Sequence, residues 1–97
     1  MVRFGGVRAV SSKDVVLEVL RAIGYYAAFE EKKESVVFTK AEFIKAYWRL
    51  RRKGRVPAVK IETLLRTLRE LAAGSDFLAY ADGRGGKYVL NTLKLPW

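Results

Sequence analysis

Apolar residues in the first third of the chain recur at intervals of three and four, which is the period of an α-helix. These residues are Val16, Val19, Leu20, Ile23 and Ala27. We therefore predict a helix over about 12–30, with Ser11 or Ser12 as its N-cap and Asp14 in the first turn, where the helix dipole favours a negative charge. Gly24 weakens such a helix by about 1 kcal/mol relative to alanine, so we expect it to mark close packing against a neighbouring element.

The next segment changes from a strand-like pattern to a helical one. The β-branched and aromatic residues of SVVFT predict a short strand at 35–39. Thr39 and Glu42 have the spacing of a capping box, which starts a second helix, and Gly54 is placed to end it. The inward face predicted for this helix comprises Phe43, Ile44, Tyr47, Leu50 and Trp48.

A third helix is predicted over about 58–73, with Pro57 at its first position and Gly74 closing it. Its apolar residues follow the helical period closely: Ile61, Leu64, Leu65, Leu68, Leu71 and Ala72. Two strands, at about 77–81 and 87–91, follow and are joined by DGRGG, a sequence typical of hairpin turns. We expect the short apolar tail TLKLPW to pack back onto the body of the protein.

Length and composition predict one domain, with residues 1–11 as a flexible N-terminal arm and residues 12–97 as the folded part. The 97 residues include no cysteine and no histidine. This composition excludes disulfides and thiolate metal sites, and it removes the commonest general base. The serines stand at predicted element ends, where capping accounts for them. We therefore expect no enzyme activity, no cofactor and no metal site.

Positive charge is concentrated in the middle of the chain. The sequence has a net charge of +9, and residues 40–69 alone contain ten basic and two acidic residues, a net +8. Such a concentration attracts polyanions, nucleic acid first. A cation near a helix C-terminus is stabilised by the helix dipole by roughly 0.3–1 kcal/mol, which explains some basic residues there. The five basic residues from Arg49 to Arg55 are more than this effect explains. We expect the basic residues to form a single continuous footprint for a polyanionic duplex.

The predicted order is helix, strand, helix, turn, helix and hairpin. With the basic turn RRKGRVPAVK and the glycine-rich hairpin tip DGRGGK, this order resembles the winged helix-turn-helix family of DNA-binding domains over roughly residues 12–91. The resemblance implies an α+β fold of three helices with a small antiparallel sheet, in which the C-terminal β-hairpin is the wing. It also implies that the third helix enters the major groove of DNA.

Candidate DNA contacts follow from this resemblance and from the basic cluster. The outward face of the third helix would contact base edges through Lys60, Thr63, Arg66 and Thr67. The basic cluster would bind phosphates through Arg49, Arg51, Arg52, Lys53 and Arg55. The alternatives for this cluster are a solvated helix face, an anionic lipid or an acidic protein. The resemblance places Arg84 in or near a minor groove at the wing, with Lys87 beside it, and a plain hairpin with exposed charges is the alternative.

We expect a transcriptional regulator that binds double-stranded DNA, located in the cytoplasm with the nucleoid and not in a membrane. The dominance of Lys, Arg and Glu favours a thermophilic source, archaeal or viral. A winged-helix protein-interaction or assembly module is the main alternative, and a sequence-nonspecific binder of RNA or chromatin is another. Tyr25, Tyr26 and Phe29 on the first helix suggest a homodimer interface or core packing, with base stacking as a further alternative.

Overall fold

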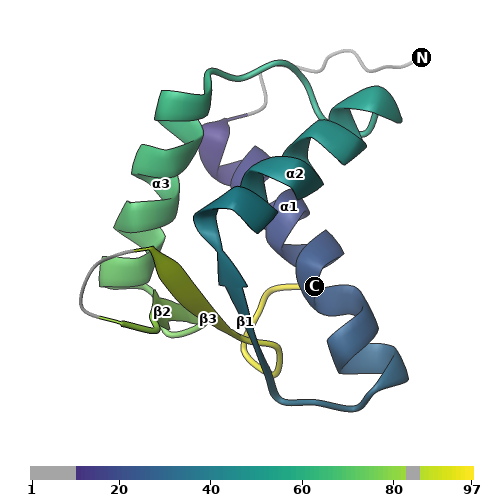
Figure 1. Ribbon diagram of the computed structural model, residues 1–97, viewed down its shortest axis with the longest axis vertical. Coiled ribbons are helices and arrows are strands. Elements are labelled where there is room, and N and C mark those ends of the chain that lie inside the picture. The colour runs from purple at the N-terminus through teal and green to yellow at the C-terminus, as the bar shows by residue number, and fades with distance from the viewer. Residues whose placement is uncertain (1–10, 83–85) are drawn as a thin grey trace.

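The computed structural model describes residues 11–82 and 86–97. These residues form an α+β structure of three α-helices and a three-stranded antiparallel sheet (Figure 1). In chain order the elements are α1 (Ser12–Tyr25) with its π-helical continuation η1 (Tyr26–Glu30), β1 (Ser35–Thr39), α2 (Lys40–Arg52), α3 (Ile61–Gly74), β2 (Leu78–Tyr80) and β3 (Lys87–Asn91). The predicted element order is therefore confirmed.

Capping boxes start both α1 and α2, which confirms the box predicted for α2 and the N-cap predicted for α1. The Asp14 N–H donates to Ser11 Oγ at 3.2 Å, and the Ser11 N–H donates to the Asp14 carboxylate at 3.3 Å. Thr39 and Glu42 make the same reciprocal pair, at 3.1 and 2.7 Å. A cap of this kind stabilises a helix by about 0.5–2 kcal/mol, because it satisfies N–H groups that have no partner within the helix.

The C-terminus of α2 is closed by a Schellman motif around Gly54. The Gly54 N–H donates to the Arg51 carbonyl at 3.0 Å, and the Arg55 N–H donates to the Leu50 carbonyl at 2.9 Å. Gly54 has a φ of 71°, a left-handed conformation in which a Cβ is strained. The predicted end of this helix is therefore confirmed.

The start of α3 differs from the prediction. Pro57 lies in the loop, and the helix begins at Ile61 with Lys60 as its N-cap. The reason is a contact that no local pattern reveals. The buried Tyr47 hydroxyl accepts a hydrogen bond from the Val59 N–H at 2.8 Å and donates one to the Val59 carbonyl at 3.1 Å. Both backbone groups of Val59 bind this side chain of α2. Val59 therefore stays outside the helix, and α3 begins two residues after it, at Ile61.

The sheet has the strand order β1-β3-β2, so the last strand lies between the other two. Val36 and Leu78 both pair with Leu90, and Phe38 pairs with Tyr88. The face that carries Phe38, Tyr88, Leu78 and Leu90 is buried against the helices. Both edge strands thus depend on β3, which closes the sheet only when the hairpin folds back.

The core joins this sheet face to the inner faces of the three helices. Its largest fully buried side chains include Tyr47, Phe43, Leu20, Leu64 and Leu68. The predicted inward faces of α2 and α3 are thereby confirmed, with one exception. Trp48 is 45% exposed, because it lies one residue beyond the buried position of Tyr47 and points away from the core.

The C-terminal tail packs back onto α1, as predicted (Figure 1). Leu95 is buried, and the Arg21 Nε donates to the Pro96 carbonyl at 2.7 Å. A Cβ on Gly24 would lie 3.0 Å from Leu90 Cδ2 and 3.5 Å from the Trp97 ring. Gly24 therefore allows α1 to approach both the sheet and the tail, which confirms the close packing expected of it.

Replacing Tyr47 by phenylalanine tests the contact that positions α3. The substitution leaves the half-buried Val59 N–H and carbonyl without their partner, so we expect the free energy of unfolding to fall by about 1–3 kcal/mol. Urea denaturation followed by circular dichroism measures it. Tyr26→Phe is the matched control, because Tyr26 is 62% exposed, and it should change stability by less than about 0.5 kcal/mol. Equal effects of the two substitutions would show that the hydrogen bonds to Val59 contribute nothing.

Candidate nucleic-acid interface

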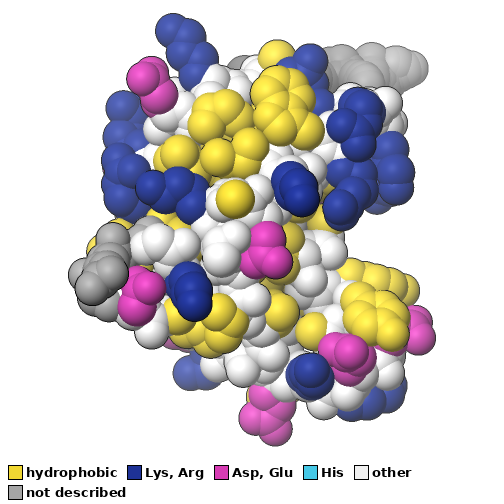
Figure 2. All heavy atoms as spheres, in the orientation of Figure 1, with side chains coloured by type: hydrophobic (Ala, Val, Ile, Leu, Met, Phe, Trp, Pro, Cys, Tyr) yellow, Lys and Arg dark blue, Asp and Glu magenta, His cyan; other side chains and the backbone are white. Residues whose placement is uncertain are grey.

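Lysine and arginine side chains gather on one face of the molecule in two groups. Figure 2 shows one group over α3 and the other over the C-terminal half of α2, with hydrophobic side chains between them. Fewer basic side chains, mixed with acidic ones, occupy the opposite end of this view. Hydrophobic side chains of the helices separate the two groups on this face, so the expected footprint is divided here. Below, the α2 bank is Arg49, Arg51, Arg52, Lys53 and Arg55, and the α3 bank is Lys60, Arg66 and Arg69.

The basic residues of both banks have no carboxylate partners among the described residues. The ion pairs found there join Arg21 to Glu18 at 2.9 Å and Lys33 to Glu31 at 3.4 Å, all outside segment 40–69. Both acids of that segment lie at helix N-termini, and Glu42 is used in its capping box. The positive charge of the segment is thus left to interact with solvent or with an external anion.

The five residues predicted to bind phosphates do not share one environment. Arg49, Arg52, Lys53 and Arg55 are exposed, but Arg51 is half-buried. An Arg51 guanidinium N–H donates to the Tyr47 hydroxyl at 3.4 Å, and its Cζ lies 5.8 Å from the centre of the Trp48 ring. This contact with an aromatic ring fixes the Arg51 side chain on α2.

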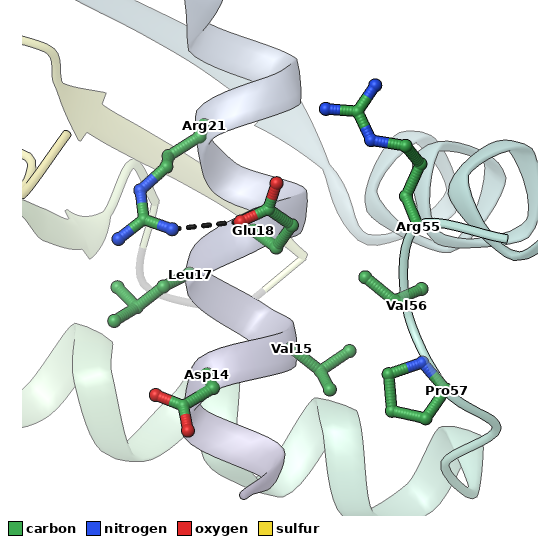
Figure 3. Close-up of a pocket in the computed structure, with 8 residues that line it drawn as sticks. All are labelled: Asp14, Val15, Leu17, Glu18, Arg21, Arg55, Val56 and Pro57. Carbon is green, nitrogen blue, oxygen red and sulfur yellow. Dashed lines mark hydrogen bonds and ion pairs between the residues drawn. The ribbon is translucent and has the colours of Figure 1, made fainter. Parts of the chain in front are cut away.

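Three of the five also border a groove between α2 and α1. Its lining includes Arg49 and Lys53 from α2, Arg55 from the loop after α2, Tyr25 from α1 and Trp97 from the tail. A second hollow adjoins it beside the loop after α2, and Figure 3 shows Arg55 extending from that loop toward α1. These cations therefore lie at the margin between α2 and α1, away from α3.

The exposed surface of α3 carries one basic residue more than predicted, and it also carries the acidic residues Glu62 and Glu70. Lys60 and Arg66 are exposed, as expected, and Thr63 is half-buried. Arg69 is exposed as well, although it was not among the predicted contacts. The sequence contained the signal for it, because residues three apart share a helix face and Arg69 follows Arg66 at that spacing.

The prediction that Thr67 lies on the outward face of α3 is wrong. Thr67 is only 7% exposed, and its hydroxyl is 3.0 Å from the Ser12 hydroxyl at the start of α1. The helical period gives the reason, since Thr67 falls on the same stripe as Leu64 and Leu68, which pack against α1. It therefore joins two helices and is unavailable to a base edge.

The hairpin between β2 and β3 is described only in part. Arg84 lies outside the described residues, and Lys87 begins β3 with an exposed side chain. Next to it, burial raises the pKa of the Tyr88 phenol, the neighbouring Tyr80 adds to the rise, and the positive charge of Arg69 opposes it. Because α3 packs against β2, this end of α3 adjoins the base of the hairpin.

The aromatic residues of the first helix are exposed. Tyr25, Tyr26 and Phe29 are 56%, 62% and 47% exposed, so the core packing considered for them is wrong. Exposure is a requirement for the homodimer interface, which stays a prediction. Within the described ranges, the helices are too short or too polar to cross a bilayer.

No protein-family model matches this chain, and no curated protein or solved structure has significant similarity to it. Arguments about its function therefore depend on the geometry and charge of its own residues.

A double-mutant cycle tests the buried position of Thr67. We expect Thr67→Val and Ser12→Ala each to lower the free energy of unfolding by about 1 kcal/mol, because each removes the same hydrogen bond. The double variant should then cost about as much as one single variant, giving a coupling of about 1 kcal/mol. Thermal or urea denaturation measures all four proteins. Strictly additive effects would show that the two hydroxyl groups do not interact.

Proposed function

We propose that this protein is a winged helix-turn-helix DNA-binding protein that acts as a transcriptional regulator. The observation that carries the proposal is the pair of basic banks on α2 and α3, which are exposed, lie on one face and lack ion pairs within the described residues. Cations held this way release counterions from a duplex when they neutralise its phosphates. Two separated banks match a duplex better than a small anion, because its two phosphate backbones flank a groove.

The arrangement of elements supports this proposal. Helices α1, α2 and α3 with the sheet order β1-β3-β2 are compatible with a winged helix, in which β2 and β3 form the wing. Residues 53–60 make a longer connection between α2 and α3 than the roughly three or four residues usual in a helix-turn-helix. The hydrogen bonds from Tyr47 to Val59 compensate for this length, because they hold the end of the connection against α2.

In the proposed complex, α3 lies in the major groove. Arg66 contacts base edges, with Lys60 and Thr63 beside it, and Arg69 contacts the backbone near the wing. Arg52 and Arg51 on α2 bind phosphates, and Arg49, Lys53 and Arg55 extend that bank toward α1. Bidentate contacts from arginine to guanine distinguish bases, whereas phosphate contacts set only the position on the duplex.

A protein-interaction module is the second candidate function. The observation that favours it is the exposed Trp48 and the hydrophobic surface between the two basic banks, which an acidic protein surface would also fit. Duplex DNA is preferred because the exposed side chains of α3 include Lys60, Arg66 and Arg69, and charged residues are depleted at the centre of protein interfaces. Binding assays with duplex DNA, single strands and structured RNA distinguish these functions.

The variant Arg52→Ala with Arg55→Ala tests the phosphate contacts. We expect weaker binding to every duplex sequence, with the slope of log K against log salt concentration reduced by about 0.9 for each phosphate that the variant no longer neutralises. Fluorescence anisotropy at several salt concentrations measures the slope. The matched control is Lys33→Ala with Lys94→Ala, which removes the same charge from exposed positions before β1 and after β3. An equal change of slope in both proteins would contradict the assignment and indicate an effect of net charge only.

Arg66→Ala tests the base contacts of α3. We expect a loss of about 1–3 kcal/mol in discrimination at the contacted base pair, since a bidentate contact of arginine to guanine is worth that much. Selection from a random duplex library, followed by anisotropy on the enriched sequence, measures this change. Arg52→Ala serves as the control and should weaken all sequences alike. An unchanged sequence preference in the Arg66 variant would remove Arg66 from base recognition.

A further inference from the structure

A groove of about 430 Å³ lies between α1, the C-terminal half of α2 and the tail. Its volume is within the range of about 300–1,000 Å³ found for small-molecule sites. Leu50 and Ala22 contribute apolar surface, and charged and aromatic side chains form the rest of its lining. The groove thus has an aromatic part and a charged part.

One wall is aromatic and held in place by the tail. The Trp97 indole N–H donates to the Thr92 carbonyl at 2.9 Å, and its ring packs edge-on against Phe29 with the centres 5.0 Å apart. Phe29 in turn contacts the Tyr25 ring at 5.0 Å. Trp97 and Tyr25 nevertheless stay 46% and 56% exposed, so their rings are positioned but not covered. Positioned, accessible rings of this kind bind a planar base by stacking.

The other wall is cationic. Arg49, Lys53 and Arg55 are exposed around the groove and have no ion pair among the described residues. The Glu18 carboxylate in the lining is paired with Arg21 at 2.9 Å (Figure 3). The Nε of Arg21 also donates to the Pro96 carbonyl at 2.7 Å. The uncompensated charge of the groove is therefore positive and comes from α2 and the loop after it, whereas the aromatic rings come from α1 and the tail.

We propose that this groove binds a nucleoside phosphate, with the base against Trp97 and Tyr25 and the phosphates between Arg49, Lys53 and Arg55. An aromatic wall alone fits any planar apolar compound, and a cationic wall alone fits any anion. A nucleoside phosphate has a planar base at one end and the negative charge at the other. Two sources supply this chemistry: a free nucleotide, or a nucleotide unit of a single nucleic-acid strand. The site goes beyond the proposed binding of a duplex, and it shares part of the α2 bank with it.

Trp97 itself provides the signal for the test. The chain contains two tryptophans, so Trp48→Phe leaves Trp97 as the sole tryptophan fluorophore. Titration with ATP, a thymidine hexanucleotide and inorganic tripolyphosphate compares a free nucleotide, a strand and a phosphate chain without a base. We expect ATP or the hexanucleotide to quench Trp97 saturably and to bind at least tenfold more tightly than tripolyphosphate. Tighter binding of ATP identifies a free nucleotide as the source, and tighter binding of the hexanucleotide identifies a strand.

Two pairs of variants in the Trp48→Phe background assign the walls. Arg49→Ala with Lys53→Ala should weaken binding of the better ligand at least tenfold, whereas Arg66→Ala with Arg69→Ala, which removes the same charge from α3, should change it less than twofold. Tyr25→Ala should weaken binding of the same ligand at least fivefold. Tyr26→Ala, at the exposed neighbouring position, should not weaken it.

Three results would overturn the site. They are no saturable quenching by either nucleotide ligand, equal affinity for tripolyphosphate, and equal loss in the two charge-matched variants. The outcome is separable from the proposed function, because the Arg66 and Arg69 variant should lose duplex binding while keeping the nucleotide site. Loss of duplex binding with intact nucleotide binding therefore tests the role of α3. Loss of nucleotide binding with intact duplex binding tests the groove.

Discussion

The position of α3 depends on one buried tyrosine. The Tyr47 hydroxyl binds both backbone groups of Val59, and an N–H of Arg51 approaches the same oxygen. Buried backbone groups need partners, and an eight-residue connection, 53–60, contains few of its own. By supplying them from within α2, Tyr47 ties the end of the loop to the core and sets where α3 begins. The distance between the two basic banks follows from this constraint.

Charge and packing are separated in this molecule. Core residues occupy the inner faces of the helices and one face of the sheet. Apart from the half-buried Arg51, the cations of segment 40–69 stay exposed, and none has a carboxylate partner in the described parts of the chain. Repulsion within each bank lowers the stability of the isolated protein, so binding of a polyanion is stabilising through the same residues. The groove beside α1 follows the same principle for the smaller ligand proposed for it, because its carboxylate, Glu18, is paired with Arg21 and its other cations have no ion pair among the described residues.

The local elements were predictable because their signals are local. Thr39 and Glu42 fix the start of α2 through contacts within one turn, and Gly54 fixes its end through a backbone conformation that other residues disfavour. The failures concern residues whose environment is set by distant parts of the chain. Thr67 fits a polar face by its type, but the start of α1 covers it. Trp48 fits a core by its type, but Tyr47 fills the buried position instead.

The sequence by itself determined the order of the elements, the caps of α1 and α2, and the concentration of positive charge, because each depends on neighbouring residues or on composition. Tertiary structure alone decided that β3 lies between β1 and β2, that the charge divides into two banks, and that Trp97 meets Tyr25 and Arg49 around one groove. These juxtapositions join residues up to 75 positions apart, as in the bond from Arg21 to Pro96. Side-chain packing selects such pairs, and no periodicity along the chain encodes them.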